Sequence, residues 1–217
     1  MIANTKPSAL EIISNMVSIV LQPLLMPTLA YAIILFGFPT LFANYNFIVK
    51  INLLLFVCLL TMIVPILAIL LLKQFGVIST LMMKERKERF IPMFFTSIIY
   101  LSFAYLLVTK LHINPLFSSI MVSIAFVTFA TAFVTYFWQI SVHSASIGGL
   151  LSLMILLNIH INNELMFAFM MLLIIAVGVV MSARLYLNAH SIWQVLAGFV
   201  LGFGLNLFVI LRLFGEI

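Results

Sequence analysis

Long hydrophobic runs separated by short polar breaks divide this 217-residue chain. A helix needs about 20 apolar residues to cross the hydrocarbon core of a bilayer. We therefore expect an all-α, polytopic transmembrane helical bundle of six to seven spans, folded as a single membrane domain over 1–217. The runs place these spans at about 12–38, 51–73, 92–109, 117–138, 147–158, 166–183 and 192–213.

Proline and glycine positions refine the expected helices. Pro23 and Pro27 interrupt the first run, so a kink is expected there. The fifth run is too short to span alone and is expected to begin inside the polar stretch around His143. Gly198 and Gly202 lie four residues apart in the last run, a spacing that favours close helix packing.

The composition strengthens the membrane assignment. The chain is 65% hydrophobic and 7% charged, whereas soluble domains carry about 25% charged residues. The lone Cys58 excludes an intramolecular disulfide. Lysines and arginines cluster at 84–89, a pattern typical of contact with anionic membrane lipids. The sequence contains no nucleic-acid-reading module, so no nucleic acid partner is expected.

Three polar breaks are expected on one side of the membrane. They are the basic cluster at 84–89, the stretch Ser141–His143 and the stretch Arg184–His190. An even number of predicted spans separates each break from the next, so all three face the same side and can converge. Together they offer cations, a hydroxyl group and two imidazoles, a set that suits phosphoryl transfer. The five acidic residues are all glutamates and form no cluster, so neither a metal nor another cofactor is expected.

The best-defined pattern is Ser182-Ala-Arg184, followed after five residues by His190. It resembles the third signature of the type 2 phosphatidic acid phosphatases, Ser-Arg-x5-His-x3-Asp. The Lys-x6-Arg-Pro and Pro-Ser-Gly-His signatures of that family have weaker counterparts around Arg89 and His143. The resemblance runs from Lys84 to Gly202, within a family-like core at about 76–217 that follows two N-terminal spans at about 1–75.

The resemblance implies a role for each matched residue. His190 corresponds to the nucleophile that forms a phosphohistidine, and His143 to the acid that protonates the leaving group. The implied phosphate-binding residues are Arg89, Lys84, Ser141 and Arg184. The implied substrate is a lipid phosphate of the phosphatidic acid, phosphatidylglycerophosphate or isoprenyl diphosphate class. The implied location is a bacterial cytoplasmic membrane.

The chain departs from the family most clearly at Gln194, where the family has aspartate. The Gln194 oxygen is expected to accept the Nδ1 proton of His190 and orient the imidazole, without supplying a negative charge. Glu85 and Glu88 are the other acids near that side of the membrane. Two alternatives stay open: a degenerate relative that binds or carries a lipid phosphate without hydrolysis, and a transporter. The sequence also leaves open which side the site faces and the oligomeric state.

Overall fold

The computed structural model describes residues 7–38, 42–81, 83, 86–111, 113–161 and 164–214. Their regular secondary structure is helical throughout. Seven helical stretches are long and apolar enough to cross a membrane, which confirms the predicted polytopic bundle. The elements are α1 (Ala9–Val20), η1 (Pro23–Leu25), α2 (Met26–Gly37), α3 (Phe47–Cys58), the π-helical turn η2 (Leu59–Ile63), α4 (Val64–Gln74), α5 (Arg86–Thr109), α6 (Pro115–Phe137), α7 (Val142–Ile161), α8 (Glu164–Tyr186) and α9 (Ile192–Phe214).

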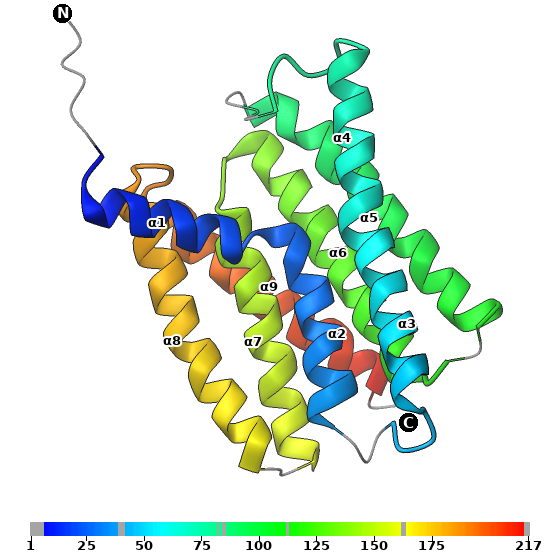
Figure 1. The fold of residues 1–217 in the computed structure, drawn as a ribbon. Helices are drawn as coiled ribbons and strands as arrows, with labels where there is room; N and C mark the ends of the chain where they lie inside the picture. Colours follow the sequence, from blue (N-terminus) through cyan, green and yellow to red (C-terminus); the bar gives the residue numbers. More distant parts are fainter. Residues whose placement is uncertain are drawn as a thin grey trace, which may run out of the picture.

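The first apolar run forms two helices that differ in direction. Helix α1 lies across the end of α8, whereas α2 runs along the bundle (Figure 1). The predicted kink is therefore a complete break. Gln22 has an extended backbone (φ −72°, ψ 147°), as expected for a residue that precedes proline. Pro23 then opens the short helix η1 instead of continuing α1.

Helix α1 turns two serines toward the protein. Ser14 is its one buried residue, and the Ser18 hydroxyl donates to the Ser14 carbonyl at 2.9 Å. At the N-terminus of α1, the Ser8 hydroxyl lies 3.0 Å from the Tyr186 hydroxyl of α8. The outer face is apolar, and Ile19 is 68% exposed. A helix that faced water would have the reverse arrangement, so the outer face of α1 suits contact with lipid.

The polar breaks gather at one end of the bundle. The α4–α5 segment, the α6–α7 break and the α8–α9 turn all lie at the upper end in Figure 1, as an even number of crossings requires. One helix boundary differs from the sequence prediction. Helix α5 begins at Arg86 and continues through Pro92, which the sequence placed at the helix start. An interior proline removes one backbone hydrogen bond, which a helix embedded among other helices tolerates.

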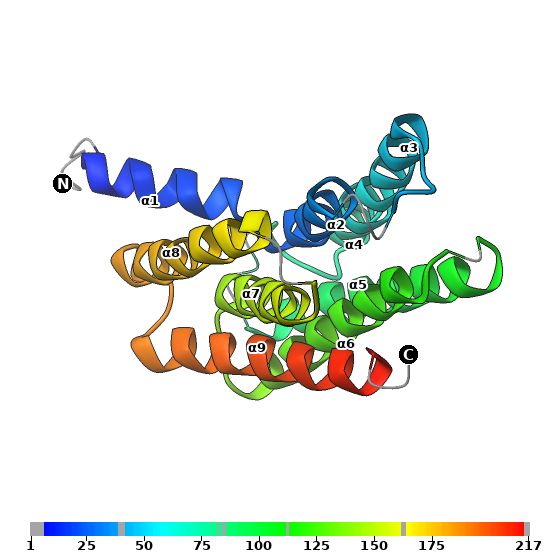
Figure 2. The same cartoon turned by 90° about the horizontal axis from the view of Figure 1, so that it is seen from below.

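Helix α7 lies between α8 and α9 at the centre of the bundle (Figure 2). Within its apolar window, 67% of the residues are buried, the largest share among the seven spans. Two glycines of α9 meet the backbone around the start of α7. A Cβ atom at Gly198 would collide with the Ser141 carbonyl, and one at Gly202 with the Ala145 carbonyl. The predicted close packing at these glycines is therefore found, and it places the start of α9 against the start of α7.

We expect Gly202→Ala to destabilise the protein, because the added methyl group meets backbone atoms that cannot rotate away. Overpacking of this kind typically costs about 1–3 kcal/mol. The measurement is the thermal unfolding midpoint of the purified protein in detergent. Gly204→Ala is the matched control, since a Cβ atom at Gly204 meets nothing within 4 Å. Equal midpoints for the two variants would contradict the packing argument.

Candidate functional site

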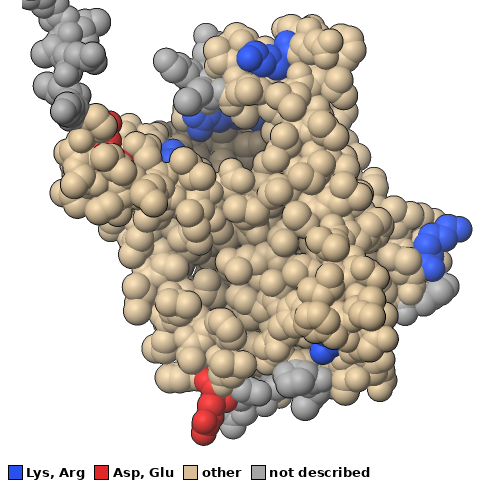
Figure 3. Space-filling model, viewed as in Figure 1, with Lys and Arg blue, Asp and Glu red and all other residues tan. Residues whose placement is uncertain are grey.

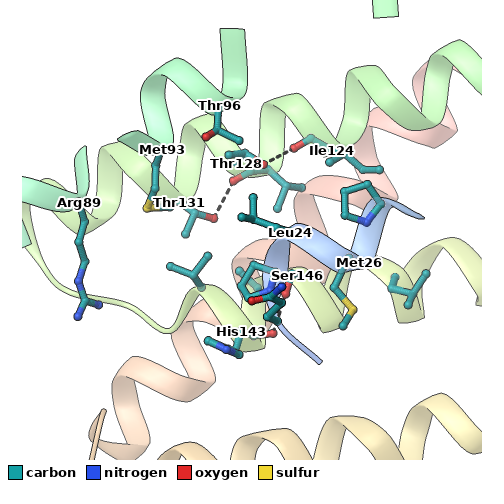
Figure 4. Close-up of a pocket in the computed structure, with 18 of the residues that line it drawn as sticks. Leu24, Met26, Arg89, Met93, Thr96, Ile124, Thr128, Thr131, His143 and Ser146 are labelled. Carbon is teal, nitrogen blue, oxygen red and sulfur yellow. Dashed lines mark hydrogen bonds between the residues drawn. The ribbon is translucent and has the colours of Figure 1, made fainter. Parts of the chain in front are cut away.

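A cavity of about 610 Å³ reaches into the bundle from the end where the polar breaks gather. Arg89, His143, Arg184 and His190 all line it. They come from α5, α7, the end of α8 and the turn before α9. Basic side chains border a hollow on the face shown in Figure 3. In the close-up, Arg89 and His143 lie toward the same end of the cavity (Figure 4).

Local sequence explains the position of His190. Helix α8 ends in a Schellman motif, in which the Asn188 N–H donates to the Leu185 carbonyl and the Ala189 N–H donates to the Arg184 carbonyl. Asn188 adopts φ 50°, a left-handed conformation that asparagine tolerates better than most residues. The motif turns the chain sharply after Arg184. It thereby places the cation and His190 on the same cavity wall.

Gln194 serves mainly as a helix cap. Its Oε1 accepts a hydrogen bond from the Ser191 N–H at 3.0 Å, and its own N–H donates to the Ser191 hydroxyl at 3.4 Å. This reciprocal arrangement is a capping box. The buried Nδ1 of His190 has no hydrogen-bond partner among the described residues. The Gln194 oxygen has a second lone pair, and the Gln194 side chain still acts on His190 by raising its pKa, so its predicted role in orienting the imidazole stays a prediction.

The surroundings of His190 favour the neutral imidazole. Burial is the largest effect, followed by the positive charges of Arg184 and Arg89, and together they lower the pKa of His190 to about 4. The Gln194 side chain and the Gln139 backbone act in the opposite direction. At pH 7, His190 therefore holds an unprotonated ring nitrogen beside two guanidinium groups. An unprotonated nitrogen is what a nucleophile requires.

Ser18, in the last turn of α1, contacts both neighbouring site residues. Its carbonyl oxygen lies 3.1 Å from Nε2 of His143, and its hydroxyl accepts from Nη1 of Arg184 at 3.1 Å. Because a carbonyl only accepts, Nε2 of His143 must carry the proton. The carbonyls at the end of a helix lack partners within the helix. The break before Pro23 therefore leaves this carbonyl free for His143.

Arg89 is held by two residues at the same end of the bundle, one before α5 and one after α6. Its Nε donates to the Met83 carbonyl at 2.8 Å. With the Gln139 amide oriented so that its oxygen faces the guanidinium, Nη1 and Nη2 of Arg89 lie 2.9 and 3.2 Å from that oxygen. The guanidinium is thus fixed by neutral acceptors, and no carboxylate of the described residues is paired with it.

Ser141 is not among the described residues that line the cavity. Ser141 is fully buried, and its hydroxyl caps α7 by accepting from the Ser144 N–H and hydroxyl at 3.3 and 3.0 Å. Its own N–H donates to the Gln194 carbonyl at 3.0 Å. Lys84 lies outside the described residues. The phosphate-binding roles of Ser141 and Lys84 stay predictions.

The charge of the cavity is unbalanced. Its described lining residues include two arginines and two histidines but no carboxylate. Glu88, one of the acids considered from the sequence, has its Oε1 occupied by the Ser79 N–H at 2.9 Å, and Glu85 lies outside the described residues. Within the described part of the chain, no three His, Cys, Asp or Glu side chains gather closely enough to hold a metal ion. The described residues thus fit an anion rather than a cation.

Sequence reasoning missed two residues of the site, Ser18 and Gln139. Gln139 begins the polar break that contains His143, so the position of that break was a usable signal. Ser18 carried none, because its contacts join residues 125 and 166 positions apart in the chain. The Ser-x-x-Gln pattern at 191–194 is the sequence signal of the capping box.

Comparisons of the chain with protein-family models, curated proteins and solved structures found no match.

Proposed function

We propose that the protein is an integral membrane phosphatase that hydrolyses a lipid phosphate through a phosphohistidine at His190. The observation that carries the proposal is the pairing of Arg89 and Arg184 with His143 and His190 around one cavity whose described lining contains no carboxylate. The arginines match the charge and planar geometry of phosphate oxygens. The sequence resemblance to the type 2 phosphatidic acid phosphatases supports the same proposal. The proposed location is a bacterial cytoplasmic membrane.

The proposed reaction has two steps. A neutral ring nitrogen of His190 attacks phosphorus, the bond from phosphorus to the lipid oxygen breaks, and His143, which enters this step as the doubly protonated imidazolium, gives its Nε2 proton to the departing oxygen and becomes neutral. Water then attacks the phosphohistidine and gives a proton to the neutral His143, the bond from phosphorus to nitrogen breaks, and inorganic phosphate leaves with His190 neutral and His143 again an imidazolium. Arg89 and Arg184 stabilise the charge on the phosphoryl oxygens throughout. The Ser18 carbonyl must release the His143 N–H before the first proton transfer.

The direct test is phosphate release by the purified protein from phosphatidic acid, phosphatidylglycerophosphate and isoprenyl diphosphate in mixed micelles. We expect release from at least one of them. A radiolabelled lipid phosphate should also leave label on the protein in an acid-labile, base-stable form, as expected of phosphohistidine. Tight binding of all three lipids without release or labelling would contradict hydrolysis.

A second candidate function is binding or transfer of a lipid phosphate without hydrolysis. It is favoured by the unpartnered Nδ1 of His190 and by the use of the Gln194 oxygen in the cap. Formation of a phosphohistidine places positive charge on the imidazole, and no described carboxylate stabilises it. Gln194→Glu keeps a capping-box residue and adds a carboxylate. Hydrolysis that appears only in this variant would identify the natural protein as the binding form.

The proposed mechanism predicts an unusual pH profile. Since the pKa of His190 is lowered from 6.5 to about 4, the imidazole stays neutral as the pH falls through 6.5 and protonates only near pH 4. The profile of kcat/KM reports ionisations of the free protein and the free substrate. We expect the protein's acidic limb near pH 4, separate from the second phosphate ionisation of the substrate near pH 6. A protein limb at about 6.5 would contradict the assignment.

A further inference from the structure

The cavity extends well beyond the arginines and histidines that form its mouth. Along α5, its wall reaches from Arg89 to Tyr100, and along α7 it reaches from His143 to Leu153. At 1.5 Å per residue, both distances correspond to about 15 Å along the helix axes. Half of the hydrocarbon core of a bilayer is also about 15 Å thick. The cavity therefore has the depth of the hydrocarbon region of a single leaflet.

The deep part of the cavity is mostly apolar, and the hydroxyl groups of its side chains bond within the protein. Thr96, Thr128 and Thr131 donate their hydroxyl hydrogens to the carbonyls four residues earlier, at 2.8, 2.8 and 2.7 Å. The Tyr100 hydroxyl donates to the Thr61 carbonyl at 2.8 Å. These donors are satisfied within the protein, so they do not require a polar ligand. Figure 4 shows the three threonines beyond Arg89, on the way to Ile124.

The volume limits what the cavity can hold. A water molecule occupies about 30 Å³ in the liquid, and a methylene group is of similar size. A cavity of about 610 Å³ therefore holds one phosphate group and about 15 carbon atoms. Two acyl chains with a glycerol backbone exceed this volume about twofold. The mouth, the depth and the volume together match a phosphate carried by one hydrocarbon chain.

We infer that this deep part of the cavity, between α2, α5, α6 and α7, binds a single hydrocarbon chain of a lipid phosphate whose head group lies at Arg89 and Arg184. The inference rests on the proposed function only for the head group. It deepens that proposal by selecting single-chain lipid phosphates, such as isoprenyl or lysophospholipid phosphates, over two-chain phosphatidic acid. The second chain of a two-chain lipid has no room in the cavity.

The test uses dodecyl phosphate with a photoreactive diazirine on its last carbon and the full-length protein in lipid nanodiscs. After illumination, mass spectrometry identifies the labelled residues. We expect label on the inner residues near Tyr100, Ile124 and Leu153. We also expect an unlabelled single-chain phosphate to reduce this labelling at least tenfold more effectively than phosphatidic acid with equal chains. Label confined to lipid-facing residues such as Leu101 and Phe126, or equal competition by the two lipids, would overturn the inference.

Two threonine variants supply the matched comparison. Thr128→Phe places an aromatic ring in the cavity and should reduce the inner labelling at least tenfold. Thr109→Phe makes the same change at another threonine that donates to the carbonyl four residues earlier but does not line the cavity, and it should leave the labelling unchanged. Equal labelling in both variants would overturn the inference.

A phosphate-free dodecyl diazirine separates the chain site from the proposed function. We expect it to label the inner residues at least tenfold less than the phosphate does, because it lacks the group that binds the arginines. Equal labelling by the two probes would contradict phosphate recognition while supporting the chain site. Phosphate-dependent labelling that stays outside the cavity would support phosphate recognition and contradict the chain site.

Discussion

His190→Ala is expected to abolish phosphate release, with a loss of kcat on the order of 10⁴-fold or more, as in other enzymes that lose a covalent nucleophile. The variant removes the ring nitrogen that would attack phosphorus and leaves Arg89, His143 and Arg184 in the cavity wall. Lipid phosphate binding should therefore persist, whereas the acid-labile phosphoprotein should disappear. The measurements are single-turnover phosphate release and trapping of the labelled intermediate.

His160→Ala is the control for that prediction. His160 lies at the other end of α7, away from the described lining of the cavity, and its loss should leave the rate unchanged within about twofold. Release by the His190→Ala variant at the rate of the natural protein would remove His190 from the mechanism. It would also exclude the proposed phosphohistidine intermediate, which forms on that residue.

Arg184→Gln should weaken lipid phosphate binding about 100-fold. Loss of one partner from a buried, charge-assisted contact typically costs 2–5 kcal/mol, and 100-fold corresponds to about 2.7 kcal/mol. The same change removes the larger of the two cationic influences on His190. The pKa of His190 should rise from about 4 toward 6.5, and the acidic limb of kcat/KM should move upward with it. Both effects are measurable in one pH series of initial rates.

Two controls accompany Arg184→Gln. One removes a cation far from the site, and the other removes a contact of Arg184 but keeps its guanidinium. Arg212→Gln removes a cation from the last turn of α9, on the opposite side of the membrane, and should change neither affinity nor pH profile. Ser18→Ala removes the hydroxyl that Arg184 contacts but keeps the guanidinium, so it should cost less than tenfold in affinity. An Arg184→Gln variant with natural affinity would show that the guanidinium does not hold the phosphate.

The hydrophobic pattern predicted the bundle because apolar length is a local property of the chain. Each span needs about 20 apolar residues, and six of the seven runs approach this length, whereas the fifth reaches it only with the polar stretch around His143. Counting crossings then placed the three polar breaks on one side without any knowledge of packing. The same reasoning could not separate α1 from α2, because hydropathy records that a segment is apolar and not whether it crosses or lies along the bilayer surface.

The details of the site depended on contacts that the sequence does not encode locally. The two arginines and two histidines were identified from their spacing and their place in polar breaks. Gln194 was assigned to the imidazole because it lies one helical turn from His190, yet its oxygen also accepts from a nearer donor, the Ser191 N–H. The contacts of Ser18 could not be predicted without the orientation of α1, which depends on the packing of α1 against α8.

The position of α1 also bears on the height of the proposed phosphate site relative to the lipids. Its apolar outer face keeps the helix at the level of the membrane surface, and Ser18 ties His143 and Arg184 to that same level. A lipid phosphate already lies there, so its chain would pass sideways into the bundle without extraction into water. Extraction would cost about 0.8 kcal/mol for each exposed methylene. For a chain of about 12 carbons, that is about 10 kcal/mol that lateral diffusion avoids.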